Sequence, residues 1–174
     1  TEGDAEAMGP AVGGHSPVNL IVIMNESFSD LTETFGLETN EDPMPFLHGL
    51  TENTVKGTAY SSVFGGTTAN SEFEFLTGNT MAFLPDGTVP FQMYVTPGMP
   101  NLGAQMKALG YETVFMHPYL SSGWNRRAVY QSFGFDEIYF QNGTSASTAS
   151  SFSGTLPTRP LCAITSRTGP TMRI

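Results

Sequence analysis

Cysteine is nearly absent from this sequence of 174 residues: there is only one, so the chain cannot form an internal disulfide bond or a cysteine-rich metal site. Charged residues are also scarce, at 13% of the chain, and the formal net charge is −9. Because nucleic acids are bound through basic surfaces, this balance argues against a nucleic acid as partner. The longest uninterrupted apolar run, residues 20–24, is far too short to cross a membrane, and no targeting segment is recognisable.

The remaining composition is that of a folded domain, with 39% hydrophobic and 11% aromatic residues. A chain of this length is enough for one domain with its own core. Residues 1–17 are acidic, rich in glycine and proline and without periodicity, which indicates a linker or a cut end. We therefore expect the domain to occupy residues 18–140.

The C-terminal segment, residues 141–174, differs from the rest in composition. It contains no Asp, Glu or Lys, it is rich in serine and threonine, and it holds the only cysteine, Cys162. A flexible linker is one interpretation of such a segment. The preferred interpretation is that the segment is foreign to the domain, either frameshifted or disordered.

Strand and helix patterns alternate along residues 18–140. The predicted strands are residues 18–24, 55–64, 111–116 and 137–140, and the predicted helices are residues 44–52, 71–76, 101–109 and 125–133. Residues 79–100 are expected to be loop-like, since four prolines interrupt them. This alternation predicts an α/β fold with a mostly parallel sheet and helices on both faces.

Polar residues follow three of the predicted strands where each strand ends. Asn25, Glu26 and Ser27 follow the first strand, the pair Thr67-Thr68 follows the second, and His117 ends the third. In an open α/β sheet, ligands bind outside the carboxyl ends of the strands. If the strands are parallel, these groups converge on one edge of the sheet and form a site.

Each of these residues also has a simpler explanation. Glu26 could lie near a helix N-terminus, where a carboxylate is favoured, and Thr67 or Thr68 could be a helix N-cap. A lone histidine such as His117 is more often structural than functional. A threonine at a helix N-terminus that faces a phosphate and a metal ion could instead act as a nucleophile.

Two further candidates follow His117 at short distance. Arg126 offers a planar guanidinium that suits a phosphate group, and Trp124 offers an apolar wall. Their simpler explanations are a surface charge and core packing. A metal-free serine hydrolase is only weakly supported, since the sequence contains no G-x-S-x-G motif.

Four segments together resemble, in order and spacing, the extracellular catalytic domain of lipoteichoic acid synthase-type phosphoglycerol transferases of the alkaline phosphatase and sulfatase superfamily. The segments are NLIVIMNESFSDL, FGGTTANSEFEFLTG, LGYETVFMHP and SGWNRRAVYQSFGFDE. The resemblance covers about residues 18–140 and implies the N-terminal part of an α/β catalytic domain. In such proteins the domain works on the extracellular face of the cell membrane and is anchored by preceding membrane helices that this sequence does not contain.

The resemblance also implies roles for individual residues. Glu26 matches a metal ligand, and Thr68 matches the catalytic threonine, which also touches the metal. His117, Trp124 and Arg126 match the residues that hold the glycerol phosphate group. The implied substrate is phosphatidylglycerol, the acceptor is a glycolipid or polymer hydroxyl, and the cofactor is a divalent metal, Mn²⁺ or Mg²⁺, which prefers such oxygen ligands.

The sequence departs from this pattern in its C-terminal part. The family completes its metal site with an Asp-His pair, but no histidine follows His117 and no acidic residue follows Glu137. We therefore expect these 174 residues not to turn over phosphatidylglycerol on their own. Sulfatase chemistry is not expected either, because Cys162 is not part of a C-x-P-x-R motif.

Two other functions remain open from the sequence. The same fold could act as a phosphatase or phosphodiesterase with water as acceptor. It could also be a non-catalytic anion-binding remnant, because Glu26 and Thr68 alone would hold a divalent ion weakly.

Overall fold

A computed structural model describes residues 18–25, 28–63, 67–141, 143–146 and 161–167 of the chain. Within these residues the strands are β1 (Leu20–Asn25), β2 (Glu112–His117), β3 (Glu137–Phe140), β4 (Gly143–Ala146) and β5 (Leu161–Arg167). The helices are α1 (Leu31–Phe35), α2 (Pro45–Gly49), α3 (Thr68–Thr77), α4 (Pro90–Met93), α5 (Leu102–Ala108) and α6 (Arg126–Ser132), with short 3₁₀ turns η1 (Met81–Phe83) and η2 (Gly123–Asn125).

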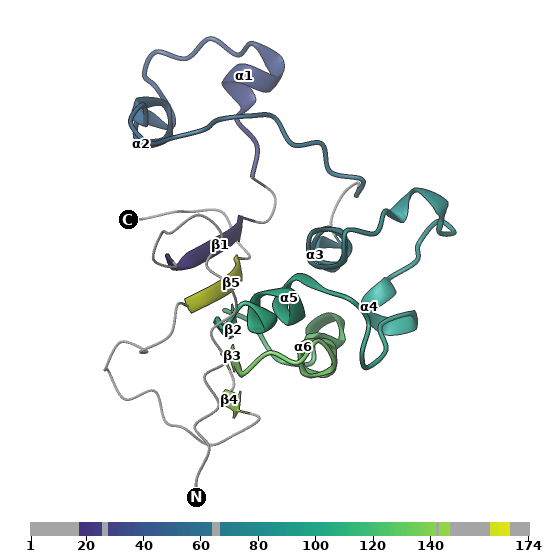
Figure 1. Cartoon of the computed structure of the whole chain (residues 1–174). Helices are drawn as coiled ribbons and strands as arrows, with labels where there is room; N and C mark the ends of the chain where they lie inside the picture. The colour runs from purple at the N-terminus through teal and green to yellow at the C-terminus, as the bar shows by residue number, and fades with distance from the viewer. Residues whose placement is uncertain (1–17, 26–27, 64–66, 142, 147–160, 168–174) are drawn as a thin grey trace, which may run out of the picture.

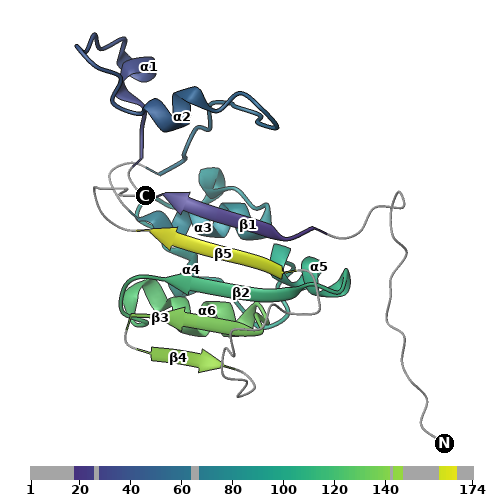
Figure 2. The same ribbon diagram turned by 90° about the vertical axis from the view of Figure 1, so that its left-hand side faces the viewer.

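The five strands form one sheet in the order β1-β5-β2-β3-β4. The first four strands of this order are parallel, and β4 pairs antiparallel with β3 at the edge, as Figure 2 shows. Every strand pair of the parallel part therefore ends at the same edge of the sheet. The predicted α/β class with a mostly parallel sheet is confirmed.

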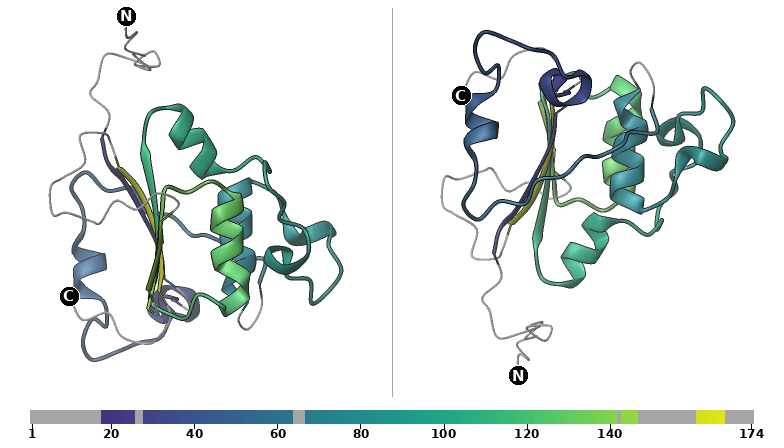
Figure 3. Two further views of the ribbon diagram at one scale, coloured as in Figure 1. Left: turned by 90° about the horizontal axis from the view of Figure 1, so that it is seen from below. Right: turned by 90° about the horizontal axis from the view of Figure 1, so that it is seen from above.

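The core lies between the sheet and the helices on one of its faces. α3, α5 and α6 lie on this face, with α4 packed against α3 (Figures 1 and 3). Burying apolar side chains here supplies the main stabilisation of the fold. The buried cluster contains Ala69, Phe73, Leu76, Val89, Phe91, Phe115, Val129, Tyr130, Phe133, Phe135, Ile138, Phe140 and Ile164.

The opposite face of the sheet is less covered. α2 lies on this other side of the sheet from α5 and α6 (Figure 3). It does not bury the outer side chains of β1, because Ile21 and Ile23 remain 65% and 56% exposed. Among the described residues, the expected helices on both faces are therefore present, but only one face is packed.

Most of the predicted elements are confirmed within two or three residues. The three strands β1, β2 and β3 and the helices α2, α3, α5 and α6 all lie where the sequence places them. Gly78, Gly110 and Gly134 follow three of these helices with φ angles of 71°, 86° and 78°, a left-handed conformation that glycine adopts at little cost. Local sequence signals therefore suffice for these elements.

The predicted strand at residues 55–64 is wrong over its described part. Residues 55–63 form no strand, and the apolar residues Val55 and Tyr60 are almost fully exposed. The preference of such a sequence for β structure depends on neighbouring strands. The place beside β1 is taken by β5, which comes from the far end of the chain. Residues 79–100, expected to be loop-like, contain the short helices η1 and α4.

The C-terminal segment contributes two strands to this sheet. β4 lies at one edge, and β5 lies between β1 and β2, where its residue Ile164 is buried. Ile164 is paired with Val22 of β1 and with Phe115 of β2. The division of the chain into domains, including a tail that is foreign to the fold, stays a prediction.

Candidate functional site

The carboxyl ends of β1 and β2 lie at one edge of the sheet. Asn25 is the last residue of β1 and His117 the last residue of β2, and both strands are parallel to β5 between them. The expected convergence is thus confirmed for these two strands. Glu26, the predicted metal ligand, lies outside the described residues, so its position stays a prediction.

The N-terminus of α3 carries the threonine pair. Thr67 occupies the N-cap position, as the simpler explanation of the pair has it, but its side chain makes no capping hydrogen bond. Its backbone is left-handed, with φ 61° and ψ 42°, which is strained for a β-branched residue. Thr68 is the first residue of the helix and is buried. This strained turn fixes the point at which Thr68 enters the helix.

A buried ion pair joins α3 to α6. The Nε of Arg126 donates to Oε1 and Oε2 of Glu72 at 3.0 and 3.1 Å, and its Nη2 donates to Oε1 at 2.7 Å. Both side chains are only 2% exposed. The hydroxyl of Tyr130 donates to Oε2 of Glu72 at 3.2 Å. Arg126 is therefore neither a surface charge nor an unpaired one.

This pair also locates Thr68. Residues four apart on a helix lie on the same face, so Thr68 lies one turn before Glu72 on the side of α3 that meets Arg126. The structure thus brings Thr68 and Arg126 to the same region between α3 and α6, although 58 positions separate them in the sequence. The sequence predicted both residues but gave no sign of the carboxylate that links them.

His117 lies next to this pair, on the helix-covered face of β2. It is 3% exposed, and neither ring nitrogen has a hydrogen-bond partner among the described residues. Its ring stacks against Phe115 at a centroid distance of 6.2 Å and lies 6.4 Å from the Phe140 ring. Burial, together with the positive charge of Arg126, lowers the pKa of His117 to about 4. The imidazole is therefore neutral at physiological pH.

A buried polar ring with two unpartnered nitrogens is unusual, because such groups are nearly always hydrogen-bonded in folded proteins. A buried histidine with a structural role is usually stabilised by hydrogen bonds, and His117 makes none to the described residues. A ligand that offers both a donor and an acceptor would satisfy it. His117 therefore fits a binding role better than a structural one.

Trp124 lies two residues before Arg126, in η2. Trp124 and Asn125 both have left-handed backbones, with φ angles of 54° and 59°. Two adjacent non-glycine residues in this conformation store strain, and such strain is concentrated at functional sites. The Nδ2 of Asn125 donates to the carbonyl oxygen of Phe91 at 3.1 Å, which holds the turn in place. Trp124 is 38% exposed, so core packing does not explain it.

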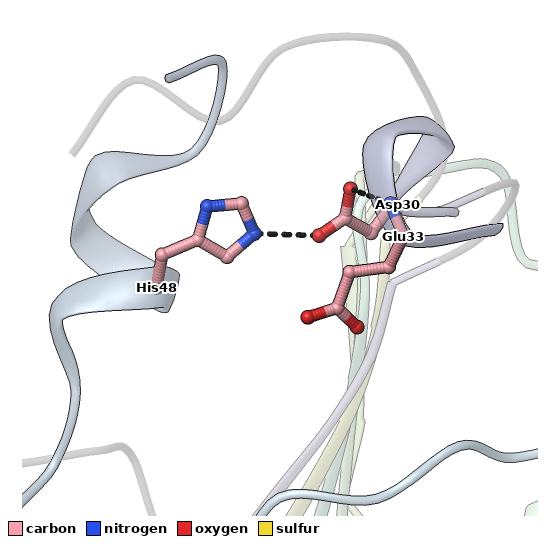
Figure 4. Close-up of side chains that lie close together, drawn as sticks. All are labelled: Asp30, Glu33 and His48. Carbon is pink, nitrogen blue, oxygen red and sulfur yellow. Dashed lines mark hydrogen bonds and ion pairs between the residues drawn. The ribbon is translucent and has the colours of Figure 1, made fainter. Parts of the chain in front are cut away.

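A second cluster, which the sequence did not predict, lies between α1 and α2 (Figure 4). The Nε2 of His48 lies 2.6 Å from Oδ2 of Asp30, and its Nδ1 lies 2.7 Å from Oδ1 of Asp42. Hydrogen bonds to Asp30 and then Asp42 raise the pKa of His48. Hydrogen bonds from Thr32 and His48 lower the pKa of Asp30 to about 2. The cluster acts as an ion-pair link between the two short helices.

The donor groups near Thr68 decide whether this region could hold a divalent metal ion. Among the described residues, the only group of three histidine, cysteine or acidic side chains close enough to share an ion is Asp30, Glu33 and His48. The part of the chain that the structure describes places no such group around Thr68. Its hydroxyl is a hard oxygen donor of the kind that Mg²⁺ and Mn²⁺ accept. The donors named from the sequence, Glu26 and Thr68, thus fit such an ion in kind but are too few to enclose it.

A family profile for the sulfatases matches residues 18–160, which is most of the chain. This chain belongs to the sulfatase family. The resemblance seen in the sequence is to members of this family, so the predicted family is confirmed.

Individual proteins of known sequence or structure agree with this assignment. A candidate cyclic beta-1,2-glucan modification protein of Rhizobium meliloti (strain 1021) is 43% identical over 118 residues, which are 68% of this chain and 18% of that protein. Lipoteichoic acid synthase 1 of Bacillus subtilis (strain 168) is 29% identical over 143 residues, which are 78% of this chain and 21% of that enzyme. The chain thus spans about a fifth of the length of these relatives.

The fold of this sulfatase-family chain is shared with a solved structure. The Streptococcus pyogenes phosphoglycerol transferase GacH, in complex with sn-glycerol-1-phosphate, matches with a TM-score of 0.69 and 19% sequence identity. The match covers 87% of this chain and 44% of that one. No helix among the described residues of the sulfatase-family chain has the length and hydropathy that crossing a bilayer requires.

Proposed function

We propose that this chain is the phosphoglycerol-binding part of a metal-dependent phosphoglycerol transferase that acts on phosphatidylglycerol. The proposal is carried by the position of Thr68, one turn before the Glu72 that Arg126 binds, and by the buried His117, which has no hydrogen-bond partner among the described residues and feels the Arg126 charge, in a sulfatase-family fold. GacH, which shares this fold, binds a glycerol phosphate. The family membership and this geometry together favour phosphoglycerol as the ligand.

Arg126 and His117 would hold the glycerol phosphate group. The guanidinium supplies positive charge and N–H donors for phosphate oxygens. The neutral imidazole offers one donor and one acceptor, which suit a glycerol hydroxyl or a phosphate oxygen. Trp124, with its exposed ring, would cover the apolar side of the glycerol unit. All three roles fit the burial and charge described above.

Thr68 would be the nucleophile. Its Oγ forms a bond to phosphorus while the bond from phosphorus to the diacylglycerol oxygen breaks, and diacylglycerol leaves with the proton that the threonine hydroxyl gave up. The covalent phosphoglycerol on Thr68 is then attacked by an acceptor hydroxyl, which restores the free threonine. The strained backbone of Thr67 holds this residue at the start of α3.

Glu26 and Thr68 would hold the divalent metal, Mn²⁺ or Mg²⁺. Such an ion lowers the free energy of a developing alkoxide and neutralises phosphate charge. Because two protein oxygens leave most coordination positions to water, we expect these 174 residues to bind the ion weakly and not to turn over on their own. Turnover is expected in a polypeptide of the relatives' full length that carries this sequence.

The acceptor would be a hydroxyl of a glycolipid or polymer. The relative at 43% identity is named for the modification of a glucan, which favours a sugar hydroxyl as acceptor. The reaction would take place on the extracellular face of the cell membrane, where the family's substrate lipid is available.

The proposal is tested first by binding. We expect the chain to bind sn-glycerol-1-phosphate in isothermal titration calorimetry, and the His117→Phe and Arg126→Met variants to lose at least about tenfold in affinity, the size of one charge-assisted hydrogen bond. Inorganic sulfate serves as the control anion. If the wild-type chain binds sulfate as well as it binds sn-glycerol-1-phosphate, the pocket is a general anion site and the proposal fails.

The second test follows the phosphoglycerol group. Phosphatidylglycerol labelled in its headgroup is incubated with the full-length polypeptide, Mn²⁺ and a glucan or glycolipid acceptor. The proposal expects the label first on Thr68 by peptide mass spectrometry and then on the acceptor. A Thr68→Ala variant should show neither. Label recovered only as free glycerol phosphate would identify a phosphodiesterase instead.

A further inference from the structure

The carboxylate of Glu72 binds the side chains of Arg126 and Tyr130. Its two oxygens receive hydrogen bonds only from the Nε and Nη2 of Arg126 and from the hydroxyl of Tyr130 among the described residues. This arrangement is a fork-to-fork pair, in which two parallel N–H groups meet two oxygens, and it fixes the plane of the guanidinium. Tyr130, which is fully buried, braces the carboxylate from the other side.

The pair leaves Nη1 of Arg126 unused, although the whole side chain is only 2% exposed. Nη1 makes no hydrogen bond with the described residues, and it lies on the side of the guanidinium near Gly123 in the η2 turn. A Cβ placed on Gly123 would lie 3.8 Å from Nη1. The η2 turn also carries Trp124, so Nη1 lies beside the turn that holds the partly exposed indole. Glu72 therefore decides which edge of Arg126 a ligand meets.

A buried ion pair is not by itself a source of stability, because removing two charges from water costs about as much as their attraction returns. A buried ion pair can instead serve to fix the geometry of the groups that it joins. A carboxylate beside an anion site also weakens the attraction for phosphate. The Glu72 carboxylate therefore lowers the positive electrostatic potential that a phosphate would meet, but it also holds the Arg126 guanidinium in one orientation.

We propose that Glu72, braced by Tyr130, is a positioning residue that holds Arg126 so that its Nη1 edge meets the phosphate of the phosphoglycerol ligand. This inference rests on the proposed function, since it assigns Arg126 to that ligand. Arginine side chains lose considerable rotamer freedom when they are ordered, so prior ordering by Glu72 reduces that loss at the binding step.

The direction in which the affinity for sn-glycerol-1-phosphate changes shows whether Glu72 acts by positioning Arg126 or by its charge. Glu72→Gln keeps the size of the side chain but offers Arg126 one acceptor and one competing donor. If Glu72 acts only through its negative charge, its removal strengthens the attraction for phosphate. If Glu72 positions Arg126, its removal weakens the affinity for sn-glycerol-1-phosphate by about tenfold, the size of one oriented charge-assisted hydrogen bond.

The calorimetric comparison uses four variants of the chain. Arg126→Met should lose about as much affinity as Glu72→Gln, and the double variant should be no weaker than Arg126→Met alone, because residues that act through each other are not additive. The matched control is Glu74→Gln on the same helix, whose carboxylate binds Ser62 and the backbone of Met81. Its affinity for sn-glycerol-1-phosphate should stay within about twofold of wild type.

Two measurements keep the inference testable if Glu72→Gln folds poorly. Tyr130→Phe removes only the bracing hydrogen bond and should weaken sn-glycerol-1-phosphate binding by about threefold, while circular dichroism shows that the variant remains folded. The ¹⁵N NMR signal of the Arg126 Nε–H should be sharp and slow to exchange in wild type and broadened in Tyr130→Phe.

These outcomes distinguish the two proposals. Wild-type binding that Glu72→Gln and Tyr130→Phe leave unchanged or strengthen overturns the positioning role and leaves the proposed function intact. A wild-type chain that does not bind sn-glycerol-1-phosphate, but keeps a sharp Arg126 Nε–H signal, overturns the proposed function and with it the ligand assigned to the Nη1 edge.

Discussion

The buried, unpartnered imidazole of His117 makes the stability of this protein depend on pH in a way that can be calculated. Its pKa is about 4 in the folded chain and 6.5 in the absence of structure. Below pH 6.5 the unfolded chain therefore takes up a proton that the folded chain takes up only near pH 4. The stabilising effect of a neutral His117 is fully present above the unfolded pKa and is lost as the pH falls toward the folded pKa.

The size of the effect follows from the two pKa values. Between about pH 7.5 and about pH 5 the free energy of unfolding should fall by about 2 kcal/mol through this one residue, and by about 3 kcal/mol at about pH 4. These amounts are large beside the total stability of a typical domain, which is about 5–15 kcal/mol. The cause is desolvation by the surrounding aromatic residues, with Arg126 as the second contribution.

The assay is urea unfolding followed by circular dichroism at a series of pH values. Other groups titrate over the same range, so the quantity of interest is the difference between wild type and His117→Phe, which cannot titrate at this position. Phenylalanine is the aromatic replacement closest in shape, and it removes the two unpartnered nitrogens. We expect wild type to lose about 2 kcal/mol more than His117→Phe between about pH 7.5 and about pH 5.

Two results would refute this reasoning. Equal losses of stability in wild type and His117→Phe would show that burial does not perturb the residue. An NMR titration of the His117 ring with a midpoint near the unperturbed value of 6.5 would show the same thing directly. Either result would also remove the main support for His117 as a ligand-binding group, because a solvated imidazole has no unmet hydrogen bonds.

Other consequences of the structure can be measured separately. Gly103→Ala would place a Cβ 2.5 Å from the buried Phe135 ring, so we expect a loss of about 1–3 kcal/mol in unfolding free energy, whereas Gly49→Ala, with no atom within 4 Å, should change little. Thr67→Gly should relieve the left-handed strain and stabilise the chain by about 1 kcal/mol in the same assay; a loss of stability would contradict the strained backbone. The raised pKa of His48 means that its ion pairs stabilise the chain below the unfolded pKa of 6.5 and cease to do so as the pH rises through the folded pKa; an NMR midpoint for His48 at or below 6.5 would contradict this.

The confirmed predictions depend on local signals. Helices α3, α5 and α6 end where a glycine follows, and β2 and β3 are short apolar runs between such stops. The wrong prediction, the strand at residues 55–64, has the composition of a strand but no partner in the described structure. The composition of a segment indicates whether it can join a sheet, but it does not indicate whether the folded chain brings the segment beside a strand.

The residues of the candidate site were likewise only partly predictable from the sequence. The motifs of the sequence predicted Thr68, His117, Trp124 and Arg126, and the structure brings Thr68, His117 and Arg126 close to one region. Glu72 was missed, although it lies within the same motif as Thr68, because nothing in the sequence distinguishes this buried carboxylate from the half-buried Glu74 two residues later. Its role became visible only through its contact with Arg126.

The sequence by itself determined the family, the α/β class and the ends of most helices and strands, since these depend on motifs and on neighbouring residues along the chain. Only the tertiary structure decided that β5 lies between β1 and β2, and that Glu72 meets Arg126 across 54 positions of sequence. It also decided that His117 is buried without a hydrogen-bond partner in the described part of the chain. Such contacts depend on how distant segments pack together, and no local preference of the chain records them.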